Sequence, residues 1–599
     1  MTTDDLPRSV PSQSLTARAE RALRSLRTRS AALLASKPRP PTAPFEGWGF
    51  LWRPALLGFF ALCAIAIGAS FPNSPFKLEM PGTWFFGVPA HPVSQFAPVN
   101  STMILFGVTL VYGGLVLLMR VWIRLADVAL RHPNAPLVKL GWMLALWTVP
   151  MLVIAPIFSR DVFSYAAQGE MVTRHMNPTV LAPGQLGSGP YPDPVDAIWR
   201  NVPAPYGPLF LMIDGWIVQI TQHNELATVI GLRVLELAAV VLLAVAVPVL
   251  AKALGHDPGH AFVLAVLNPL VVLTIIGGAH NDGIMMALLI AGLALAAKRH
   301  PVWGIVVCAI AASIKAPAAL GVVYIAWEWL GPNLPVRQRL RSLAIAGLLT
   351  AGVLGALTFI SGLGFYWVKN LGTPGTVRSW AAPATGLGMA LAGLGRAVGL
   401  HASTASAIGI TRMIGLAATV VICVWLLFNA DRIGWLKALG YSLLALVVLG
   451  PVVQPWYLTW GLLLLAVVAT GKLRGWVIAL SVISPFVGLP GGRDLLRGIV
   501  NAPMIETGCV LLLLWGLLLA PLGAWTTYGR NDSGIEPLTP SPHGRRRARA
   551  GLQDPLDLDH VEPPTVLAAD LPLHADHLKA ARLVETDRGL VLSHDPPDD

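Results

Sequence analysis

Long apolar stretches alternate with short polar connections over most of this chain. Many of the stretches approach the roughly 20 residues that an α-helix needs to cross the hydrocarbon core of a bilayer. Apolar segments of this length, without the alternation typical of half-buried strands, indicate membrane-spanning helices. The pattern therefore predicts an all-α, polytopic transmembrane helical bundle with about 14 spans. The predicted spans are residues 53–70, 102–119, 138–157, 230–250, 259–278, 283–297, 301–315, 316–330, 342–361, 407–428, 435–453, 455–470, 474–489 and 504–522.

The composition agrees with a membrane protein. Of the 599 residues, 54% are hydrophobic and 13% are charged, whereas soluble domains carry about 25% charged residues. The distribution of polar residues predicts three regions: a basic cytosolic N-terminal segment (1–52), a transmembrane domain (53–525) and a Pro-rich, polar tail (526–599). Such a tail lacks enough apolar surface to form a core, so we expect it to be disordered in the cytosol.

The net charge of +11 is interpreted here as an excess of Lys and Arg in cytoplasmic loops and as attraction to anionic lipid headgroups. Membrane lipids are therefore expected partners, and nucleic acid is not. The four cysteines all lie inside apolar runs without CxxC spacing. They read as small buried hydrophobes, and the sequence predicts no metal site.

The positions of the basic loops predict the orientation in the membrane. If residues 207–220 and 384–400 do not cross the bilayer, the basic loops all fall on the side of the N-terminus. The positive-inside rule makes this side the cytoplasm of a multi-pass plasma-membrane protein with both termini inside. Residues 158–229 then form one long external loop carrying interfacial helices. The basic loops are residues 119–132, 298–301, 335–341, 431–437 and 471–474.

The segment "SRDVFSYAAQGEM" opens this external loop. Asp161, Ser164, Tyr165 and Gln168 follow the i, i+3, i+4, i+7 spacing that places them on one helix face. The apolar residues between them would lie in lipid, as in an interfacial helix. A carboxylate at a helix start is held ionised by backbone N–H groups. Alternatively, Asp161 is only a helix cap or an interfacial partner of Arg160.

Further polar residues are predicted on the same external side. The loop 182–209 is long and rich in Pro and aromatic residues, which favours a shaped lid over a flexible linker. Contact with a sugar ring or a headgroup would suit Tyr191, Trp199 and Tyr206, although interfacial aromatic belts are commoner. "HND" at 280–282 suits hydrogen bonds to hydroxyls or phosphate, with helix capping as the alternative. His280 and Asp282 alone are too few for a metal site.

Two more motifs belong to this group. Lys315 in "SIKAPA" interrupts two apolar runs, where a lysine is costly unless it snorkels or has an anionic partner. A lipid phosphate would be such a partner. In "VVQPWYLTW", Gln454, Trp456 and Tyr457 stand at the outer start of a predicted span, where a binding role competes with aromatic anchoring.

These motifs, in this order, resemble the actinobacterial membrane α-1,6-mannosyltransferases that extend the mannan core of lipomannan and lipoarabinomannan. The residues that carry the resemblance are "SRDVFSYAAQGEMVTRHMNP", "PYGPLF", "AHNDGIMMALLIAG", "SIKAPA" and "QPWYLTW", within about residues 50–525. The resemblance implies a GT-C glycosyltransferase fold, with polyprenyl-phosphate-mannose as the donor substrate, a lipid-anchored mannoside as the acceptor and no cofactor. Two predicted spans precede the catalytic loop here, where the simplest GT-C layout has one.

The resemblance also implies residue roles. An inverting transfer needs one carboxylate to accept the proton of the attacking hydroxyl and a set of donors and cations to stabilise the leaving phosphate. Asp161 matches the catalytic carboxylate of the family. Lys315 and His280 would contact the phosphate, with Arg378 or Arg493 as external alternatives. The active site would face the periplasm, and no nucleotide would enter it.

Two rival functions remain open from sequence. A GT-C enzyme using another polyprenyl-phosphate sugar, such as arabinose, would show the same motifs. A lipid or glycolipid flippase belongs to a different class. Transporters commonly show repeated halves and ionisable sites at mid-membrane, whereas here we see no convincing repeat and the polar residues gather at one face.

Overall fold

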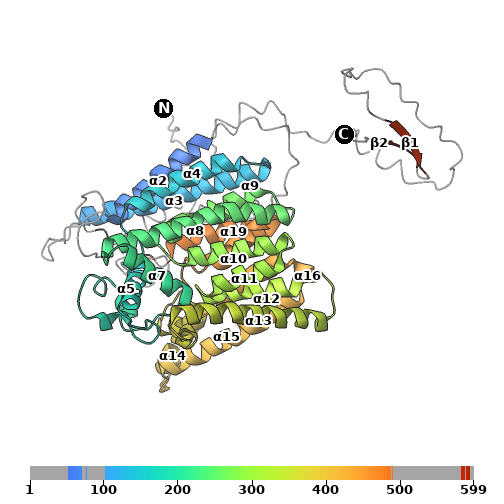
Figure 1. The fold of residues 1–599 in the computed structure, drawn as a ribbon. Helices are drawn as coiled ribbons and strands as arrows, with labels where there is room; N and C mark the ends of the chain where they lie inside the picture. Colours follow the sequence, from blue (N-terminus) through green and yellow to red (C-terminus); the bar gives the residue numbers. More distant parts are fainter. Residues whose placement is uncertain are drawn as a thin grey trace, which may run out of the picture. The chain divides into compact units, whose positions relative to one another are not determined.

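A computed structural model of the chain describes a helical protein (Figure 1). It divides into two units, Met1–Ala520 and Pro521–Asp599, which are described separately. The second unit contains an antiparallel pair of strands, β1 (Arg582–Thr586) and β2 (Gly589–Ser593), where the sequence predicts no regular structure. The described residues are 51–70, 74, 76, 78, 101–487, 489, 582–586 and 589–593.

The helical elements of the first unit follow the apolar stretches of the sequence, with short 3-10 helices (η2, η5, η6, η7) and two π-helical segments (η3, η4). They are α2 (Trp52–Ser70), α3 (Ser101–Arg131), α4 (Leu137–Val153), α5 (Asp161–Thr173), η2 (Pro183–Leu186), α6 (Ala197–Arg200), α7 (Pro208–Ile220), α8 (Glu225–Ala253), α9 (Pro258–Ala261), η3 (Phe262–Val266), η4 (Val271–Gly277), α10 (Asp282–Ala297), α11 (Pro301–Ala312), η5 (Ala316–Ala318), α12 (Ala319–Glu328), α13 (Val336–Ser361), η6 (Tyr366–Thr376), α14 (Pro383–Ala397), α15 (Thr404–Phe428), α16 (Ala430–Ile433), α17 (Trp435–Val448), α18 (Thr459–Val467), α19 (Gly471–Ile483) and η7 (Ser484–Phe486).

Five of the described helices, α2, α3, α8, α13 and α15, are long and apolar enough to cross a membrane, and the bent pair α9–η3 and η4 makes a sixth candidate. The structure does not show the predicted count of about 14 spans. Predicted spans such as 283–297 and 301–315 coincide with the shorter apolar helices α10 and α11. The predicted span 504–522 lies outside the described residues.

The predicted span 259–278 is broken in the middle. Its two halves, Pro258–Val266 and Val271–Gly277, are bent by 55°. The break falls at Asn268 and Pro269, where proline removes a backbone N–H and disfavours continued helix. Asn268 satisfies the freed groups: its side-chain Nδ2 donates to the carbonyl of Leu264 (3.0 Å), and its Oδ1 accepts from the N–H of Leu270 (3.0 Å).

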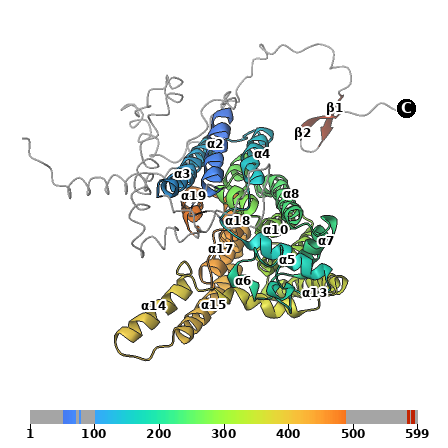
Figure 2. The ribbon, with the colours of Figure 1, turned by 90° about the vertical axis from the view of Figure 1, so that its left-hand side faces the viewer.

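The helices pack mainly against their neighbours in sequence. α2, α3 and α4 lie side by side, and below them α8, α10, α11, α12 and α13 follow one another across the unit (Figure 1). α5 packs on α7 at one end of these helices. α14 and α15 form a hairpin that extends away from the other helices (Figure 2) and returns to them through α17.

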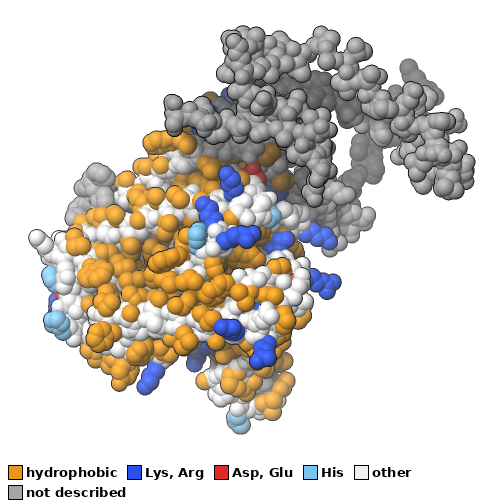
Figure 3. Space-filling view, turned by 45° about the vertical axis from the view of Figure 1, so that its right-hand side comes forward, with side chains coloured by type: hydrophobic (Ala, Val, Ile, Leu, Met, Phe, Trp, Pro, Cys, Tyr) orange, Lys and Arg blue, Asp and Glu red, His pale blue; other side chains and the backbone are white. Residues whose placement is uncertain are grey.

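The outside of the helical unit is largely apolar. Hydrophobic side chains cover a broad continuous band in the space-filling view, and Lys and Arg side chains gather at its margins (Figure 3). Large apolar side chains such as Trp142 (74% exposed), Leu348 (76%) and Phe359 (88%) point outward. Water would penalise an apolar surface of this size, so the chain is an integral membrane protein.

The environment of helix α5 differs from the predicted one. We expected its apolar residues Val162, Phe163, Ala166 and Met171 to lie in lipid, but each is at most 2% exposed. This prediction is wrong because α5 packs on α7 and α8, and these apolar side chains are buried within the protein. At Gly169, an added Cβ would lie 2.5 Å from the backbone oxygen of Asp214, so only glycine allows α5 and α7 to approach this closely.

Candidate functional site

Asp161 is the first residue of α5. The chain reaches it through Phe158, whose φ of 65° lies in the left-handed region. The N–H of Asp161 donates to Oγ of Ser159 (3.2 Å), which fixes the start of the helix. The carboxylate is therefore held at the end of α5, with its side chain 16% exposed.

Two ring nitrogens meet the Asp161 carboxylate. The indole N–H of Trp199, from α6, donates to Oδ1 at 3.1 Å. Nδ1 of His280 lies 3.5 Å from Oδ2, a distance long for a hydrogen bond but within reach of an electrostatic contact. Burial by itself raises the pKa of Asp161, yet the contact with His280 and the charge of Lys315 prevail and hold it below its ordinary value. The carboxylate is therefore ionised at neutral pH.

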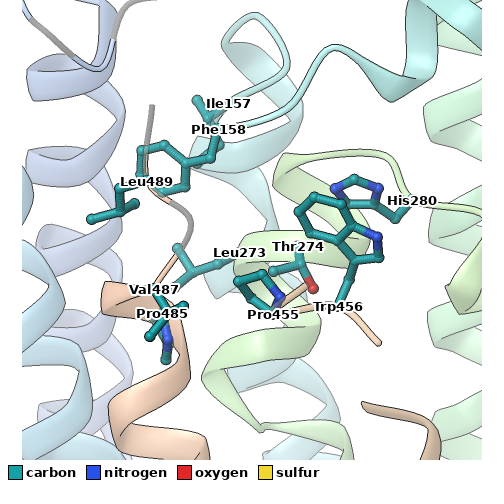
Figure 4. A pocket seen from close by; sticks show the side chains of 10 residues that line it. All are labelled: Ile157, Phe158, Leu273, Thr274, His280, Pro455, Trp456, Pro485, Val487 and Leu489. Carbon is teal, nitrogen blue, oxygen red and sulfur yellow. The ribbon is translucent and has the colours of Figure 1, made fainter. Parts of the chain in front are cut away.

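His280 is held by aromatic stacking. Its ring lies face to face with the indole of Trp456, with the ring centroids 3.7 Å apart and the planes inclined by 17° (Figure 4). The residue is 1% exposed and follows Ala279, whose φ is 53°. Below the two rings is a small cavity of about 20 Å³, bounded among others by Thr274 and Pro455. A cavity of this volume has room for about one water molecule.

Lys315 and Asp282 form an ion pair next to this group. Nζ of Lys315 lies 2.9 Å from Oδ2 and 3.0 Å from Oδ1 of Asp282, and it donates to Oδ1 of Asn281 at 3.3 Å. The indole N–H of Trp460 also donates to Asp282 Oδ1. Asp282 is fully buried, whereas the Lys315 side chain is 12% exposed. The anionic partner of Lys315 within the protein is thus a carboxylate on α10.

Aromatic rings surround the Lys315 ammonium. Nζ lies 4.7 Å from the ring centroid of Tyr457, 5.6 Å from that of Trp460 and 5.7 Å from that of Tyr206. Ring faces attract cations at such distances. Burial raises the pKa of the Tyr206 hydroxyl well above its ordinary value, and the charge of Asp161 adds to the effect. Tyr206 is therefore a neutral hydroxyl that can donate a hydrogen bond.

A cavity of about 590 Å³ opens at this group of residues. Its polar end is formed by α5, the loop around Trp199 and Lys315, and its apolar side by α12, α15 and α17. Leu416 and Val420 of α15 line it while remaining 60% and 55% exposed, so the cavity reaches the outer apolar surface. The lining residues are Asp161, Ser164, Gln168, Trp199, Val202, Pro203, Pro205, Tyr206, Lys315, Ala316, Pro317, Ala319, Leu320, Val323, Leu371, Thr373, Leu416, Thr419, Val420, Cys423, Val424, Leu446, Val447, Pro451, Val452, Tyr457 and Trp460.

The structure brings most of the predicted site residues together. Asp161, Gln168, Tyr206, Lys315 and Tyr457 line the large cavity. His280 and Trp456 line the small one.

The remaining four predicted residues lie behind or beside the cavities. The Tyr165 hydroxyl faces Oδ1 of Asn281 at 3.5 Å, and Asp282 is committed to Lys315. Arg160 is half-buried next to Asp161, and Gln454 accepts the N–H of Tyr457 through its backbone carbonyl. Neither Arg160 nor Gln454 lines either of the two cavities described above.

Three polar contacts of the site were not predicted. Sequence reasoning noted Trp199 as an aromatic contact but not as a donor to Asp161, and it missed Asn281 and Trp460 as partners of the ion pair. Trp460 stands four residues after Trp456, and a helical period there would have placed both indoles near one face. Asn281 was visible within the "HND" motif.

No group of three or more His, Cys, Asp and Glu side chains in the described part of the chain is arranged to hold a metal ion. The site instead offers an ionised carboxylate at a cavity edge, beside an imidazole, an ammonium group and several neutral hydroxyl and indole donors. Such a set can accept a proton from a hydroxyl and can stabilise a leaving anion. The apolar side of the cavity adds room for a hydrocarbon chain.

Comparison with known proteins agrees with this chemistry. Residues 55–331 match the family model described as alpha-(1->6)-mannopyranosyltransferase, N-terminal domain. Residues 384–520 match the MptB C-terminal domain. The first match includes Asp161, the "HND" motif and Lys315, and the second includes α14, α15 and α17 on the apolar side of the cavity.

Individual relatives are similar over most of their length. A probable alpha-(1->6)-mannopyranosyltransferase of Mycolicibacterium smegmatis is 33% identical over 446 residues, covering 68% of this chain and 79% of the relative. Alpha-(1->6)-mannopyranosyltransferase B of Corynebacterium glutamicum is 30% identical over 523 residues, covering 81% and 83%. Alpha-(1->6)-mannopyranosyltransferase A of Mycobacterium tuberculosis is 30% identical over 387 residues, covering 63% and 74%. No solved structure matches the chain.

Proposed function

Because this chain belongs to the actinobacterial α-(1→6)-mannopyranosyltransferase family and is thus a glycosyltransferase, we propose that it transfers mannose from polyprenyl-phosphate-mannose to a lipid-anchored mannan. The acceptor would be a phosphatidylinositol mannoside or lipomannan, and the new bond an α-1,6 linkage. Transfer takes place on the periplasmic side of the plasma membrane, within a GT-C type bundle. The count of about 14 spans remains a prediction.

The shape and chemistry of the large cavity carry this proposal. A polyprenyl-phosphate sugar has a polar head and a long hydrocarbon chain, and the cavity has a polar end at Asp161 and an apolar side formed by α12, α15 and α17. Leu320 and Val323 on α12 line it together with Leu416 and Val420 on α15. A soluble nucleotide-sugar donor would gain nothing from such an apolar side, whereas burial of a hydrocarbon chain is favourable.

The proposed reaction is a single inverting displacement. The oxygen of the acceptor 6-hydroxyl forms a bond to C1 of the donor mannose, while the bond from C1 to the phosphate oxygen breaks. The bonding electrons leave with the phosphate, and the hydroxyl proton passes to a carboxylate oxygen of Asp161. A β-linked donor gives an α-linked product because the attack comes from the face opposite to the phosphate.

The low pKa of Asp161 fits this order of events. It keeps the carboxylate ionised, although it makes the group a weaker base. A hydroxyl becomes strongly acidic only as its oxygen bonds to C1, so the proton moves late in the step. Trp199 fixes one carboxylate oxygen and leaves the other, near His280, for the proton.

Lys315 and Tyr206 are proposed to stabilise the leaving phosphate. Their side chains line the polar end of the cavity together with Asp161. The pairing with Asp282 holds the ammonium in position, and the exposed part of Lys315 faces the cavity. His280 lies behind Asp161 and acts through it. Arg160 is proposed to contact the substrate from beside Asp161, and Gln454 to shape the turn that carries Trp456 and Tyr457.

The direction of α10 supports a periplasmic active site. Asp282 begins this helix at the site, and Lys298 caps its other end, followed by Arg299. Sixteen residues separate the site from this basic loop by about 24 Å along the helix axis. By the positive-inside rule the basic end is cytoplasmic, so the site lies toward the opposite face.

The donor can be tested directly. Membranes containing the protein are incubated with radiolabelled polyprenyl-phosphate-mannose or polyprenyl-phosphate-arabinose, and the lipid-linked saccharides are separated. We expect mannose alone to enter an endogenous lipid-linked mannan, in a linkage that an α-1,6-specific mannosidase removes. Membranes with the empty expression vector are the control. Transfer of arabinose, or of mannose from a nucleotide sugar when lipid-linked donor synthesis is blocked, would contradict the proposal.

A further inference from the structure

The polar face of α5 continues beyond Asp161 along the same cavity. Ser164 and Gln168 follow Asp161 by three and seven residues, and both line the cavity with only 3% of each residue exposed. Oγ of Ser164 and Oε1 of Gln168 are buried and have no hydrogen-bond partner among the described residues. Buried polar groups in folded proteins nearly always have such partners. A ligand in the cavity would supply them.

The position of these oxygens indicates which ligand. Gln168 lies about 10 Å along the α5 axis from Asp161, which is the length of seven helical residues. The apolar side of the cavity lies on α12, α15 and α17, and Lys315 lies between α11 and η5. In an inverting displacement, the attacking hydroxyl and the leaving phosphate stand on opposite sides of the reacting carbon. The face of α5 that carries Asp161, Ser164 and Gln168 therefore lies on the acceptor side of the reacting carbon, from which the hydroxyl attacks.

We propose that Ser164 and Gln168 form the acceptor subsite and bind hydroxyl groups of the terminal sugar of the acceptor glycan. This inference rests on the proposed function and specifies the acceptor side of the same cavity. Sugar hydroxyls donate to the two oxygens, while the Trp199 ring on α6 offers a face against which a sugar ring packs. The close packing of Gly169 against the Asp214 backbone fixes the position of α5 in the cavity wall.

The test separates acceptor from donor binding. Ser164→Ala and Gln168→Leu are purified and assayed with a synthetic α-1,6-linked dimannoside lipid as acceptor and polyprenyl-phosphate-mannose as donor. Loss of one hydrogen bond is expected to raise the KM for the acceptor about 5- to 10-fold, with the KM for the donor unchanged. Gln219→Leu, the same replacement at an exposed position of α7 outside the cavity, is the matched control.

Two results would overturn the subsite. One is an unchanged acceptor KM in both variants, and the other is a rise in the KM for the donor equal to that for the acceptor. Failure of the proposed function would look different, because the unsubstituted protein itself would then transfer no mannose to the dimannoside lipid.

A second inference comes from two buried charged residues of α8 that the sequence analysis did not single out. Arg233 and Glu236 are each 2% exposed and lie one turn apart. The guanidinium of Arg233 donates to carbonyls at the ends of both α4 and η4, the two segments that lead to Asp161 and to His280. The acceptor carbonyls belong to Met151, Leu152, Ile154, Ile276 and Gly277.

Glu236 acts on the next segment along the chain. Its Oε2 accepts the N–H of Ile284 at 3.1 Å, within the first turn of α10. It lies so close to Gly283 that an added Cβ would be 2.1 Å from the same oxygen, so a larger residue at position 283 would displace this carboxylate oxygen. The N–H of Ile157 also donates to the carbonyl of Gly277 (2.9 Å), which joins the two segments held by Arg233.

The geometry points to Arg233 and Glu236 as positioning residues that set the distance between Asp161 and the "HND" motif. Glu236→Leu should lower kcat about 10- to 100-fold with both KM values nearly unchanged, because small displacements of reacting groups have effects of this size. Glu236→Gln keeps an oxygen for the Ile284 N–H and should restore most of the activity. Arg233→Met should lower kcat to a similar extent as Glu236→Leu, again with both KM values nearly unchanged.

The Gln variant distinguishes positioning from a general structural role. Thermal unfolding of the purified variants is measured alongside activity. The inference fails if Glu236→Gln loses as much kcat as Glu236→Leu, or if the loss in Glu236→Leu appears in KM instead of kcat.

Discussion

Replacing Asp161 by Asn should lower kcat for mannosyl transfer about 10²- to 10⁴-fold, the usual contribution of a positioned general base. Asparagine has nearly the same shape, and its amide oxygen can still accept the Trp199 N–H, so we expect folding and donor binding to persist. An amide cannot take up the hydroxyl proton. Turnover is measured in membranes at matched protein levels, with thermal unfolding of the purified variant as a check on folding.

If Asp161→Asn stays active, another carboxylate must act as the base, and the structure argues against the two nearest candidates. Both oxygens of Glu170 are engaged, with Arg174 and His223 at 2.7 Å each, and Glu170 does not line the cavity. Asp282 is closed off by Lys315 and Trp460. Asp193→Asn is the matched control, because Asp193 is exposed within the same predicted external loop (158–229) as Asp161. This variant should retain full activity. Wild-type turnover in Asp161→Asn would remove the base from our mechanism altogether.

Replacing Lys315 by Ala should have the second-largest effect, because it acts on both stability and catalysis. It leaves Asp282 fully buried without its cation, a change that destabilises proteins by about 3–5 kcal/mol. It also removes the positive charge from the polar end of the cavity, so use of the polyprenyl donor should weaken more than use of the acceptor. The KM values for both substrates and the unfolding temperature are measured.

A paired substitution separates the two effects. Lys315→Met combined with Asp282→Asn removes both charges and should recover much of the lost stability, while activity stays low for want of the cation. If the double variant regains wild-type activity, the charge of Lys315 has no part in the reaction and its role is structural.

The local features of the site were predictable from the sequence. The spacing of Asp161, Ser164, Tyr165 and Gln168 predicts one helix face, and α5 does begin at Asp161. Asp161, Ser164 and Gln168 line the same cavity. The break in the predicted span 259–278 also had a signal, because Asn-Pro is a common turn dipeptide.

Contacts between distant segments were not predictable in the same way. The partner of Lys315 is a carboxylate 33 residues away on a separate helix, and no period in the sequence relates the two. Arg233 and Glu236 lie within an apolar span whose hydropathy conceals them. The burial of Phe163 was missed because an apolar residue facing protein and one facing lipid look alike in a membrane sequence.

The exposed wall of α15 has a consequence for the kinetics of the enzyme. Leu416 and Val420 belong both to the cavity and to the outer surface of the described helices, so the proposed carrier approaches sideways, within the plane of the bilayer. The rate of transfer then depends on the mole fraction of the lipid-linked donor in the membrane and not on its concentration in the total sample volume. Adding inert lipid to the bilayer therefore slows the reaction although the total amounts of enzyme and donor are unchanged. The polyprenyl phosphate released by the reaction stays in the same leaflet and competes with fresh donor for the cavity.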